Sequence, residues 1–258
     1  PLIIMVVYAF STAAGDFTLE NFARMGTYTA VFTRSFKLAI IATLIALLIG
    51  YPVSYMLSKE GPQVQRIAMV LIMLPMWMNF LLRTYSWMSI LENNGLLNQL
   101  FQQIGLIDLY NQIAMHFAAD PAAYVPIDHF QMIGTQGAVV LGMVYNYLPF
   151  MILPIYSVLV KLDHSLIEAA RDLGASSVQV FRKVILPLSL PGVLSGITMV
   201  FVPAVSTFII SRMLGGGSNL MIGDLIEMQF LGNSYNLNVG SAMSLVLMII
   251  VLLCMSFT

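Results

Sequence analysis

Long apolar blocks alternate with shorter polar segments along this chain. Five blocks reach or approach the length that a helix needs to cross a lipid bilayer, about 20 mostly apolar residues. They are residues 35–57, 67–91, 137–160, 191–213 and 239–257. The opening run, residues 2–14, is apolar but shorter, and the last block stops without a polar tail. The pattern predicts an all-α polytopic membrane protein of six transmembrane helices, with the first and last truncated.

The composition agrees with a membrane domain over residues 1–258. Hydrophobic residues make up 59% of the chain and charged residues only 9%, whereas soluble domains average about 25% charged residues. The single cysteine, Cys254, excludes an internal disulfide and a cysteine-based metal cluster. His116, His129 and His164 are scattered at spacings that suit no pair of metal ligands on one helix. We therefore expect no metal and no cofactor bound by this chain.

The distribution of basic residues predicts the orientation, because Lys and Arg are enriched in cytoplasmic loops. The segment at residues 92–136 contains four acidic residues and no Lys or Arg, which places it outside the cytoplasm. Within it, the spacing of Leu96, Leu97, Leu100 and Ile104 predicts a short amphipathic helix ending at Gly105. The loops at residues 58–66 and 161–190 face the cytoplasm; their basic residues are Lys59, Arg66, Lys161, Arg171, Arg182 and Lys183.

Prolines interrupt several of the apolar blocks. Each removes a backbone hydrogen bond and bends or loosens its helix, which membrane helices tolerate where neighbours satisfy the freed carbonyl. The bends are open to two interpretations, irregular packing or helices that line a cavity. The prolines are Pro52, Pro75, Pro149, Pro154 and Pro203.

The loop at residues 161–190 predicts two short helices joined by a tight turn. Asp163 or Ser165 can cap the first helix, and Gly174 supplies the left-handed conformation that commonly ends one. Ser176 and Gln179 have the spacing of a capping box for the second helix, which we expect to end at Pro187.

The first of these helices has one apolar and one polar face. Its apolar stripe comprises Leu166, Ile167, Ala170 and Leu173, with Glu168, Arg171 and Asp172 on the polar side. Such a stripe suits a groove on a partner protein, with Glu168 pairing with a cation there. The alternative is a helix lying on the membrane surface with its leucines in lipid.

The order of residues in EAARDLGASSVQVFRKVILP resembles the EAA loop of ABC-importer permeases. Val184 stands where that family usually has Ile. The matching residues, which the resemblance implies couple the permease to an ATPase, are Glu168, Ala169, Ala170, Gly174, Leu186 and Pro187. In type I importers two permease subunits each lay such a loop into one ATPase subunit. Closure of the ATPases then switches the cavity between inward-facing and outward-facing states.

The resemblance implies several partners in a bacterial inner membrane. They are a second permease subunit, which we expect to be a paralogue, two ATPase subunits that hold ATP and Mg²⁺, and an extracytoplasmic substrate-binding protein. The chain has no G-x-x-x-x-G-K-[ST] string, and the run from Gly215 to Ser218 lacks the lysine. We therefore expect a non-catalytic subunit, and nothing in the sequence points to nucleic acid.

Three stretches are similar to the polyamine (spermidine/putrescine) permeases: residues 74–98, 147–175 and 201–231. A polyamine carries separated ammonium groups, which carboxylates and aromatic faces hold well. Aromatic belts at the membrane boundary and solvent-exposed or binding-protein-facing acids are the alternatives for these residues. The candidates for the substrate path are Trp77, Tyr85, Tyr145, Tyr147, Phe208, Asp224 and Glu227.

Other classes fit less well. Arg83 lies inside a predicted span, towards its outer end. We expect it either to form an ion pair with Glu92 or Asp224 or to extend its charged group to the membrane interface. An ion-coupled secondary transporter would carry more charges at mid-membrane. An intramembrane serine protease would carry a histidine in a span. The nineteen methionines are spaced as packing residues, although soft-metal ligands are the alternative. A permease for another small ligand stays open.

Overall fold

The structure, a computed structural model, describes residues 2–12, 14–117, 124–232 and 235–256. Within these ranges the elements are helices, with one isolated bridge between Ser11 and Phe17, which confirms the all-α class. The helices are α1 (Leu2–Ala9), α2 (Glu20–Arg24), η1 (Met25–Tyr28), α3 (Thr29–Ser58), α4 (Pro62–Trp77), α5 (Phe80–Leu91), α6 (Leu96–Gln103), α7 (Leu106–Phe117), α8 (Gln136–Leu159), α9 (His164–Asp172), α10 (Ser177–Val180), η3 (Phe181–Ile185), α11 (Leu186–Ser206), α12 (Ile209–Leu214), α13 (Ile222–Leu231) and α14 (Leu237–Ser256).

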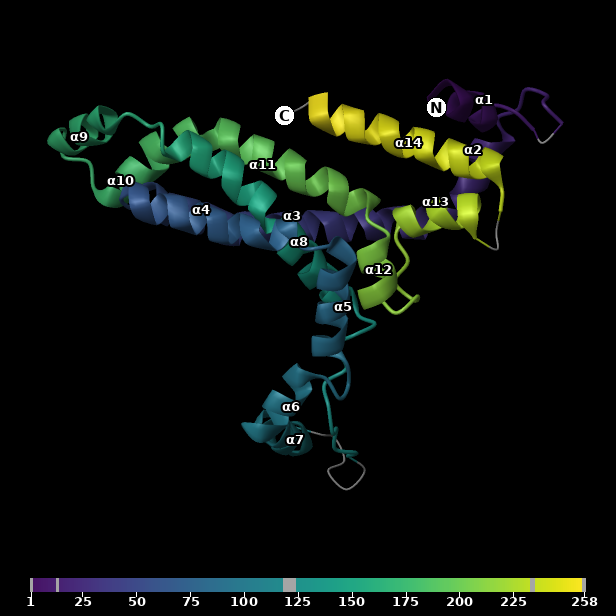
Figure 1. Cartoon of the computed structure of the whole chain (residues 1–258), viewed down its shortest axis with the longest axis horizontal. Coiled ribbons are helices and arrows are strands. Elements are labelled where there is room, and N and C mark those ends of the chain that lie inside the picture. The colour runs from purple at the N-terminus through teal and green to yellow at the C-terminus, as the bar shows by residue number, and fades with distance from the viewer. Residues whose placement is uncertain (1, 13, 118–123, 233–234, 257–258) are drawn as a thin grey trace.

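Three long helices, α3, α8 and α11, form the centre of the molecule and run side by side in Figure 1. Small residues let them approach closely, as is typical of membrane helices. A Cβ atom on Gly192 would lie 2.8 Å from the backbone oxygen of Pro154. The Tyr51 hydroxyl and Ser189 Oγ are 2.8 Å apart, and Ser54 Oγ donates to the carbonyl of Ile152 over 3.1 Å. Close packing and buried hydrogen bonds therefore hold the three helices together.

Among the described residues, four helical segments are long and apolar enough to span a membrane: Glu20–Ser58, Gln136–Leu159, Ser177–Ser206 and Leu237–Ser256. A fifth is possible if the bent pair Pro62–Trp77 and Phe80–Gln103 counts as one span. The predicted first span corresponds to α1, which has eight residues and packs against α14. The polytopic arrangement is thus confirmed, and the number six is approximate.

The predicted span at residues 67–91 is not one straight helix. The chain bends by 90° between α4 and α5. Met78 is extended, and the Asn79 side chain accepts hydrogen bonds from the backbone amides of Leu81 and Leu82, at 2.9 and 3.4 Å. Asn79 therefore starts a new helix, and Pro75 one turn earlier has already removed a hydrogen bond from the old one.

Helices α6 and α7, in the segment at residues 92–136, project away from the central helices (Figure 1). The predicted amphipathic helix is α6, followed by Gly105 with a φ of +72°. The second helix, α7, was not predicted. Two asparagine side chains connect α6 and α7 to the chain that leads to α8, and each of them both donates and accepts a backbone hydrogen bond. Asn98 exchanges hydrogen bonds with the backbone of Phe130 at 2.9 and 3.0 Å, and Asn111 does so with Ile127 at 2.8 and 2.9 Å.

The predicted span at residues 191–213 is displaced. Its helix begins earlier, in continuity with α10, and α11 ends at Ser206. Thr207 is extended, with a ψ of 143°, so Ile209–Leu214 forms the separate helix α12. Pro203 one turn earlier weakens the end of α11. This break allows α12 and α13 to fold beside the central helices (Figure 1).

Candidate functional site

Helix α9 is the element that carries the Glu-Ala-Ala sequence. Its N-cap is Asp163, whose carboxylate accepts a hydrogen bond from the amide of Ser165 at 2.9 Å. It lies with α10 at one end of the molecule, beyond the central helices (Figure 1). Both helices are therefore placed where a partner can reach them without entering the bundle.

The predicted apolar stripe of α9 is divided between two faces. Ile167 and Ala170 pack against the protein's own apolar cluster around Val180 and Ile185. By contrast Leu166 is 47% exposed and Leu173 90% exposed, and Ala169 is exposed between them. Residues three or four apart share one side of a helix. The single stripe of the sequence prediction was therefore wrong.

We call Leu166, Ala169 and Leu173 the α9 docking face, because this side of the helix presents apolar atoms to the surroundings. Glu168 is exposed next to it. Neighbouring exposed leucines on a short polar helix make this face a candidate interaction surface. The inward side, with Ile167 and Ala170, fixes the orientation of this face relative to the membrane helices.

Gly174 ends α9 in the predicted left-handed conformation, with a φ of +82°. The amide of Ala175 donates to the carbonyl of Ala170 over 3.1 Å, and that of Gly174 to Arg171 over 2.8 Å. These two bonds form a Schellman motif, which satisfies carbonyls at the helix end. The predicted capping box of Ser176 follows directly, so the turn between α9 and α10 is sharply defined.

Pro187 does not end a helix, contrary to the sequence prediction. It lies in the first turn of α11, and the helical segment continues from Ser177 to Ser206. Proline cannot donate the backbone hydrogen bond that a regular helix requires four residues earlier. The chain accommodates this with the π-helical turn η3 over Phe181–Ile185, immediately before Leu186.

This continuity joins the loop to a membrane span. The segment from Ser177 to Ser206 has 30 residues, which corresponds to about 45 Å of helix at about 1.5 Å per residue. One helical segment therefore runs from α10 into the centre of the bundle without an intervening loop.

The acidic candidates Asp224 and Glu227 contact Arg212. This arginine lies beyond Ser206, at the end of the segment Ser177–Ser206 that is opposite α10. Asp224 is completely buried, and its Oδ2 accepts hydrogen bonds from Ser211 Oγ at 2.5 Å and from the Met221 amide at 2.8 Å. Arg212 Nε lies 3.8 Å from Asp224 Oδ1, and Arg212 also forms a salt bridge with Glu227. Helices α12 and α13 are thus joined by one ionic cluster.

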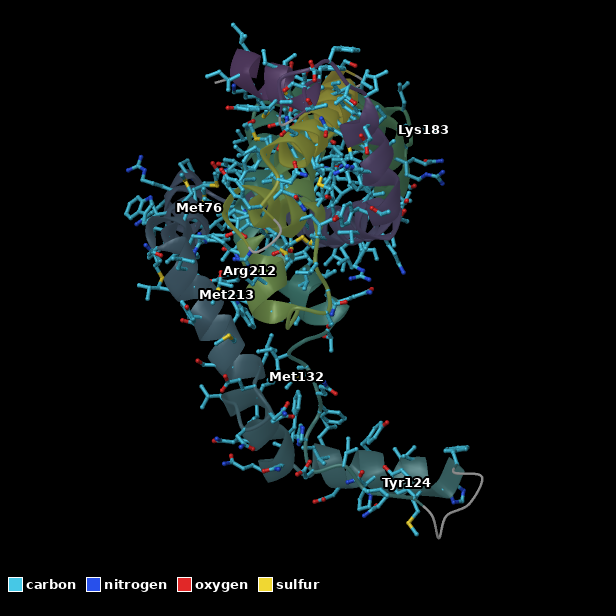
Figure 2. All side chains as sticks on the ribbon, turned by 90° about the vertical axis from the view of Figure 1, so that its right-hand side faces the viewer. Met76, Tyr124, Met132, Lys183, Arg212 and Met213 are labelled. Atoms are coloured by element: carbon cyan, nitrogen blue, oxygen red, sulfur yellow. The ribbon has the colours of Figure 1, made fainter. Side chains whose placement is uncertain are left out.

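Asp224 and Glu227 both lie outside the candidate spans. The pKa values of their carboxyl groups are shifted in opposite directions. Burial raises the pKa of Asp224, and the hydrogen bond from Arg212 lowers the pKa of Glu227. The hydrogen bonds to Asp224 oppose the effect of burial without cancelling it. In this conformation both acids are engaged within the chain. Figure 2 shows that the projecting segment, which ends near Tyr124, lies far from Arg212 and therefore from this cluster.

The predicted ion pair of Arg83 was wrong. Arg83 is buried, its guanidinium lies 5.8 Å from the Phe80 ring, and its Nε and Nη1 have no hydrogen-bond partner in the described part of the chain. Asp224 is unavailable because Ser211 and Arg212 engage it.

The aromatic candidates form two groups. Tyr145 packs edge-on against Trp87, with ring centroids 5.3 Å apart, and the Tyr147 hydroxyl donates to the Pro203 carbonyl over 3.4 Å. Both lie half-buried on α8. Trp77 and Tyr85, by contrast, are 78% and 53% exposed on α4 and α5, and Phe208 is 37% exposed before α12. These exposed rings can enclose a ligand only together with a surface of another molecule.

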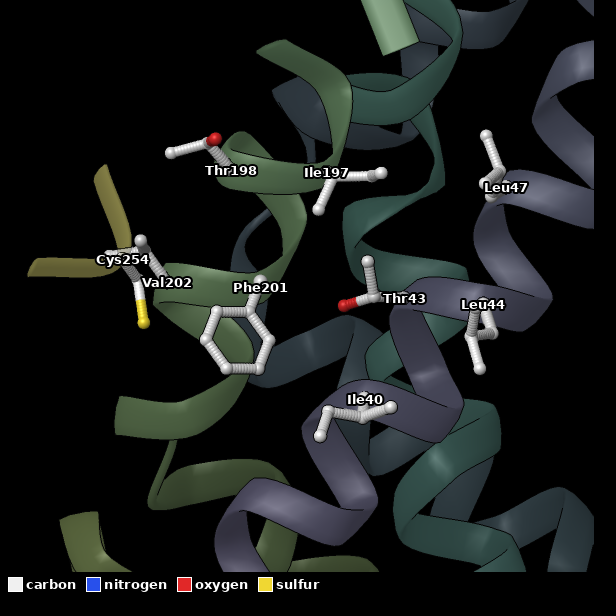
Figure 3. Close-up of a pocket in the computed structure, with 9 residues that line it drawn as sticks. All are labelled: Ile40, Thr43, Leu44, Leu47, Ile197, Thr198, Phe201, Val202 and Cys254. Carbon is white, nitrogen blue, oxygen red and sulfur yellow. The ribbon is translucent and has the colours of Figure 1, made fainter. Parts of the chain in front are cut away.

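An apolar groove of about 390 Å³ lies between α3, α11 and α14, with Cys254 at its edge (Figure 3). Thr43 and Thr198 line it, but their hydroxyls donate to the carbonyls of Ala39 and Leu194. Among the described residues, no charged side chain and none of the substrate-path candidates lines this groove. Its chemistry suits hydrocarbon rather than an ammonium group.

Comparison with known proteins identifies the class. Residues 1–258 match the family described as binding-protein-dependent transport system inner membrane component. The chain belongs to this family, and it is a multi-pass permease component of a bacterial inner membrane.

Particular relatives narrow the similarity. The chain is 39% identical over 236 residues to the spermidine/putrescine transport system permease protein PotB of Escherichia coli (strain K12), covering 91% of this chain and 78% of that protein. It is 37% identical over 261 residues to PotB of Haemophilus influenzae, covering 98% of this chain and 84% of that protein.

Solved structures share the fold. A bacterial ABC transporter involved in the import of the acidic polysaccharide alginate matches with a TM-score of 0.75 at 14% identity, covering 99% of this chain and 87% of that one. The MetNI methionine ABC transporter, in an inward-facing conformation, matches with a TM-score of 0.59 at 18% identity, covering 90% and 93%.

Proposed function

We propose that this chain is one permease subunit of an ATP-driven importer that moves spermidine or putrescine across the inner membrane. The observation that carries the proposal is the exposed α9 docking face, fixed to the bundle by Ile167 and Ala170. A sequence identity of 37–39% to spermidine/putrescine permeases supports the choice of cargo.

In this proposal the α9 docking face inserts into a groove of a separate ATPase subunit, with Glu168 paired with a cation of that groove. The ATPase carries ATP and Mg²⁺, and this chain performs no hydrolysis. When two ATPase subunits close, α9 moves together with the continuous helix that runs from Ser177 to Ser206. The motion is thereby transmitted to the translocation path.

A second permease subunit, a paralogue of this chain, completes that path, and an extracytoplasmic binding protein delivers the substrate. The exposed rings of Trp77, Tyr85 and Phe208 support this, because large aromatic surfaces favour contact with a partner or ligand. Tyr145, packed against Trp87 of α5, and Tyr147, bonded to Pro203 of α11, lie on different sides of α8, so one of them at most faces the path in this conformation.

Asp224 and Glu227 contribute to the path through Arg212. Ammonium groups of a polyamine replace the Arg212 guanidinium as the partner of these acids when the extracytoplasmic side opens. The close salt bridge with Glu227 supports this exchange, because it shows that the acids accept a cation in this position. A neutral small ligand, the alternative cargo of such a permease, would gain nothing from this exchange.

Uptake of labelled spermidine and putrescine tests the proposal in cells lacking this chain, with and without its restoration. We expect restored uptake that survives a protonophore and stops when ATP is depleted. Glu168→Lys should abolish uptake at unchanged membrane levels, whereas Lys161→Gln, on the same loop, should not. Restored but protonophore-sensitive uptake would instead indicate an ion-coupled carrier. Absence of uptake with the ATPase co-purifying would point to another small ligand.

A further inference from the structure

A second cavity lies behind α9, on the side opposite the docking face. Its volume is about 330 Å³, and it is bounded by the ends of α3 and α8 and by α9, α10 and η3. The lining residues are Tyr55, Ser58, Lys59, Leu159, Leu162, Ile167, Arg171, Ser177, Val180 and Ile185. The cavity is therefore walled by two membrane helices on one side and by the ATPase-docking loop on the other.

The charged residues that line the cavity, Lys59 and Arg171, are both basic, and no acidic residue of the described chain lines it. Lys59 Nζ lies 3.9 Å from the centre of the Tyr55 ring. Neither basic side chain forms an ion pair within the described residues, although Arg24 and Arg212 do. Both residues are exposed. Two cations that face one cavity without a counter-charge repel each other, and an anion between them removes that cost.

The side chains fit a phosphate group in particular. A guanidinium can donate two parallel hydrogen bonds to phosphate oxygens, and an ammonium supplies a point charge. Ser177 adds a hydroxyl to the wall. The apolar residues Leu159, Leu162 and Ile185 leave little competition from other polar groups. Lys59 also ends a membrane helix in a loop predicted to be cytoplasmic, at the level where anionic lipid headgroups lie.

We propose that this cavity binds one phosphate group, carried by an anionic phospholipid of the cytoplasmic leaflet or by a soluble cytosolic anion. The bound phosphate bridges Lys59 on α3 to Arg171 on α9. It thereby fixes the angle at which α9 presents the docking face. The regulatory consequence rests on the proposed function, because it assumes that α9 docks on the ATPase; the binding itself does not.

Native mass spectrometry of the purified complex of permeases and ATPases tests the binding. One arm uses nanodiscs of phosphatidylcholine with and without phosphatidylglycerol, and the other titrates inorganic phosphate onto the complex in phosphatidylcholine alone. We expect retained phosphatidylglycerol, bound inorganic phosphate, or both; the arm that responds identifies the source of the phosphate.

The double variant Lys59→Gln/Arg171→Gln should bind the responding anion about tenfold or more weakly, which corresponds to about 1.4 kcal/mol per tenfold. Lys161→Gln, which removes a cation outside the cavity, should bind as the unaltered protein does. If the double variant fails to assemble, Lys59→Gln alone, which lies outside α9, is judged by the same criterion. Equal anion binding by variants and unaltered protein, or none in either arm, would overturn the proposal.

This measurement is independent of transport. A complex that binds phosphate through Lys59 and Arg171 but imports no polyamine would retain the anion site and refute the cargo. Polyamine uptake by a complex that binds no phosphate would retain the cargo and refute the anion site. Hydrogen exchange of α9 supplies the regulatory readout: bound anion should slow exchange in the unaltered protein and have no effect in the double variant.

Discussion

Replacing Gly174 tests whether the turn after α9 sets the geometry of ATPase docking. Gly174 has a φ of +82°, and a Cβ atom at this position would meet nothing within 4 Å. The cost of Gly174→Ala is therefore confined to the backbone, at about 1–2 kcal/mol for the left-handed conformation. A penalty of this size lowers the ratio of the native turn to its other conformations by a factor of about 5–30.

The consequence should appear in docking rather than in folding. If only the native turn presents the α9 docking face correctly, the apparent affinity for the ATPase falls with the fraction of molecules in that turn, by up to a factor of about 30. Gly174→Val should cost at least as much as alanine. Gly174→Asn should restore most of the affinity, because asparagine tolerates the left-handed region.

The assay is binding of the purified ATPase to the permease in nanodiscs, followed by ATP hydrolysis stimulated by the binding protein. Gly61→Ala serves as the matched control, because Gly61 has a φ of −67° and equally open surroundings. Membrane levels of all variants should match the unaltered protein. Full affinity in Gly174→Ala, or an equal loss in Gly174→Asn and Gly174→Val, would refute the reasoning.

Three further substitutions probe the packing. Gly192→Ala places a Cβ atom 2.8 Å from a backbone oxygen and should cost about 1–3 kcal/mol of stability, which lowers the melting temperature. Gly137→Ala, whose nearest contact is at 3.6 Å, should leave the melting temperature unchanged. Tyr51→Phe removes the 2.8 Å bond to Ser189 and should cost about 1 kcal/mol in chemical denaturation; an unchanged midpoint would contradict that bond. Asp224→Ala leaves the buried Met221 amide without its acceptor, while Ser211 keeps the Phe208 carbonyl as a partner. It should cost about 1–3 kcal/mol, whereas Asp224→Asn keeps an acceptor and should cost less. Because burial raises the pKa of Asp224 in the folded state, its contribution to stability falls as the pH rises through that pKa; melting curves against pH should show this loss in the unaltered protein and not in Asp224→Asn.

The long elements were predictable because membrane spans depend on runs of apolar residues. The span predicted at residues 137–160 agrees with α8, Gln136–Leu159, to within one residue at each end. The turn at Gly174 and the cap at Ser176 were also predictable, since each follows from local backbone chemistry.

The breaks were harder to predict. Apolar residues continue through Met78 in the bend between α4 and α5, so hydropathy does not mark it. The available signal was Asn79 after Pro75, a cap behind a proline. Pro187 misled in the opposite direction, because a proline in the first turn of α11 looks locally like the end of the preceding helix.

Partner choice among side chains depended on tertiary structure. The sequence could not separate Ile167 and Ala170 from Leu166 and Leu173, because the assignment of faces depends on which side of α9 meets the bundle. Likewise Arg212, not Arg83, partners Asp224, because the break after Ser206 turns α12 towards α13.

The central claim is that ATP hydrolysis drives polyamine uptake through α9. The most direct measurement follows ATP hydrolysis and spermidine transport together in proteoliposomes that contain this chain, its partner permease and the ATPase. The binding protein and labelled spermidine are supplied on the side of the membrane opposite the ATPase. We expect hydrolysis stimulated by the loaded binding protein and matched by accumulation of spermidine. In Glu168→Lys both should be lost together. Accumulation that continues in Glu168→Lys, or without ATP, would contradict the account.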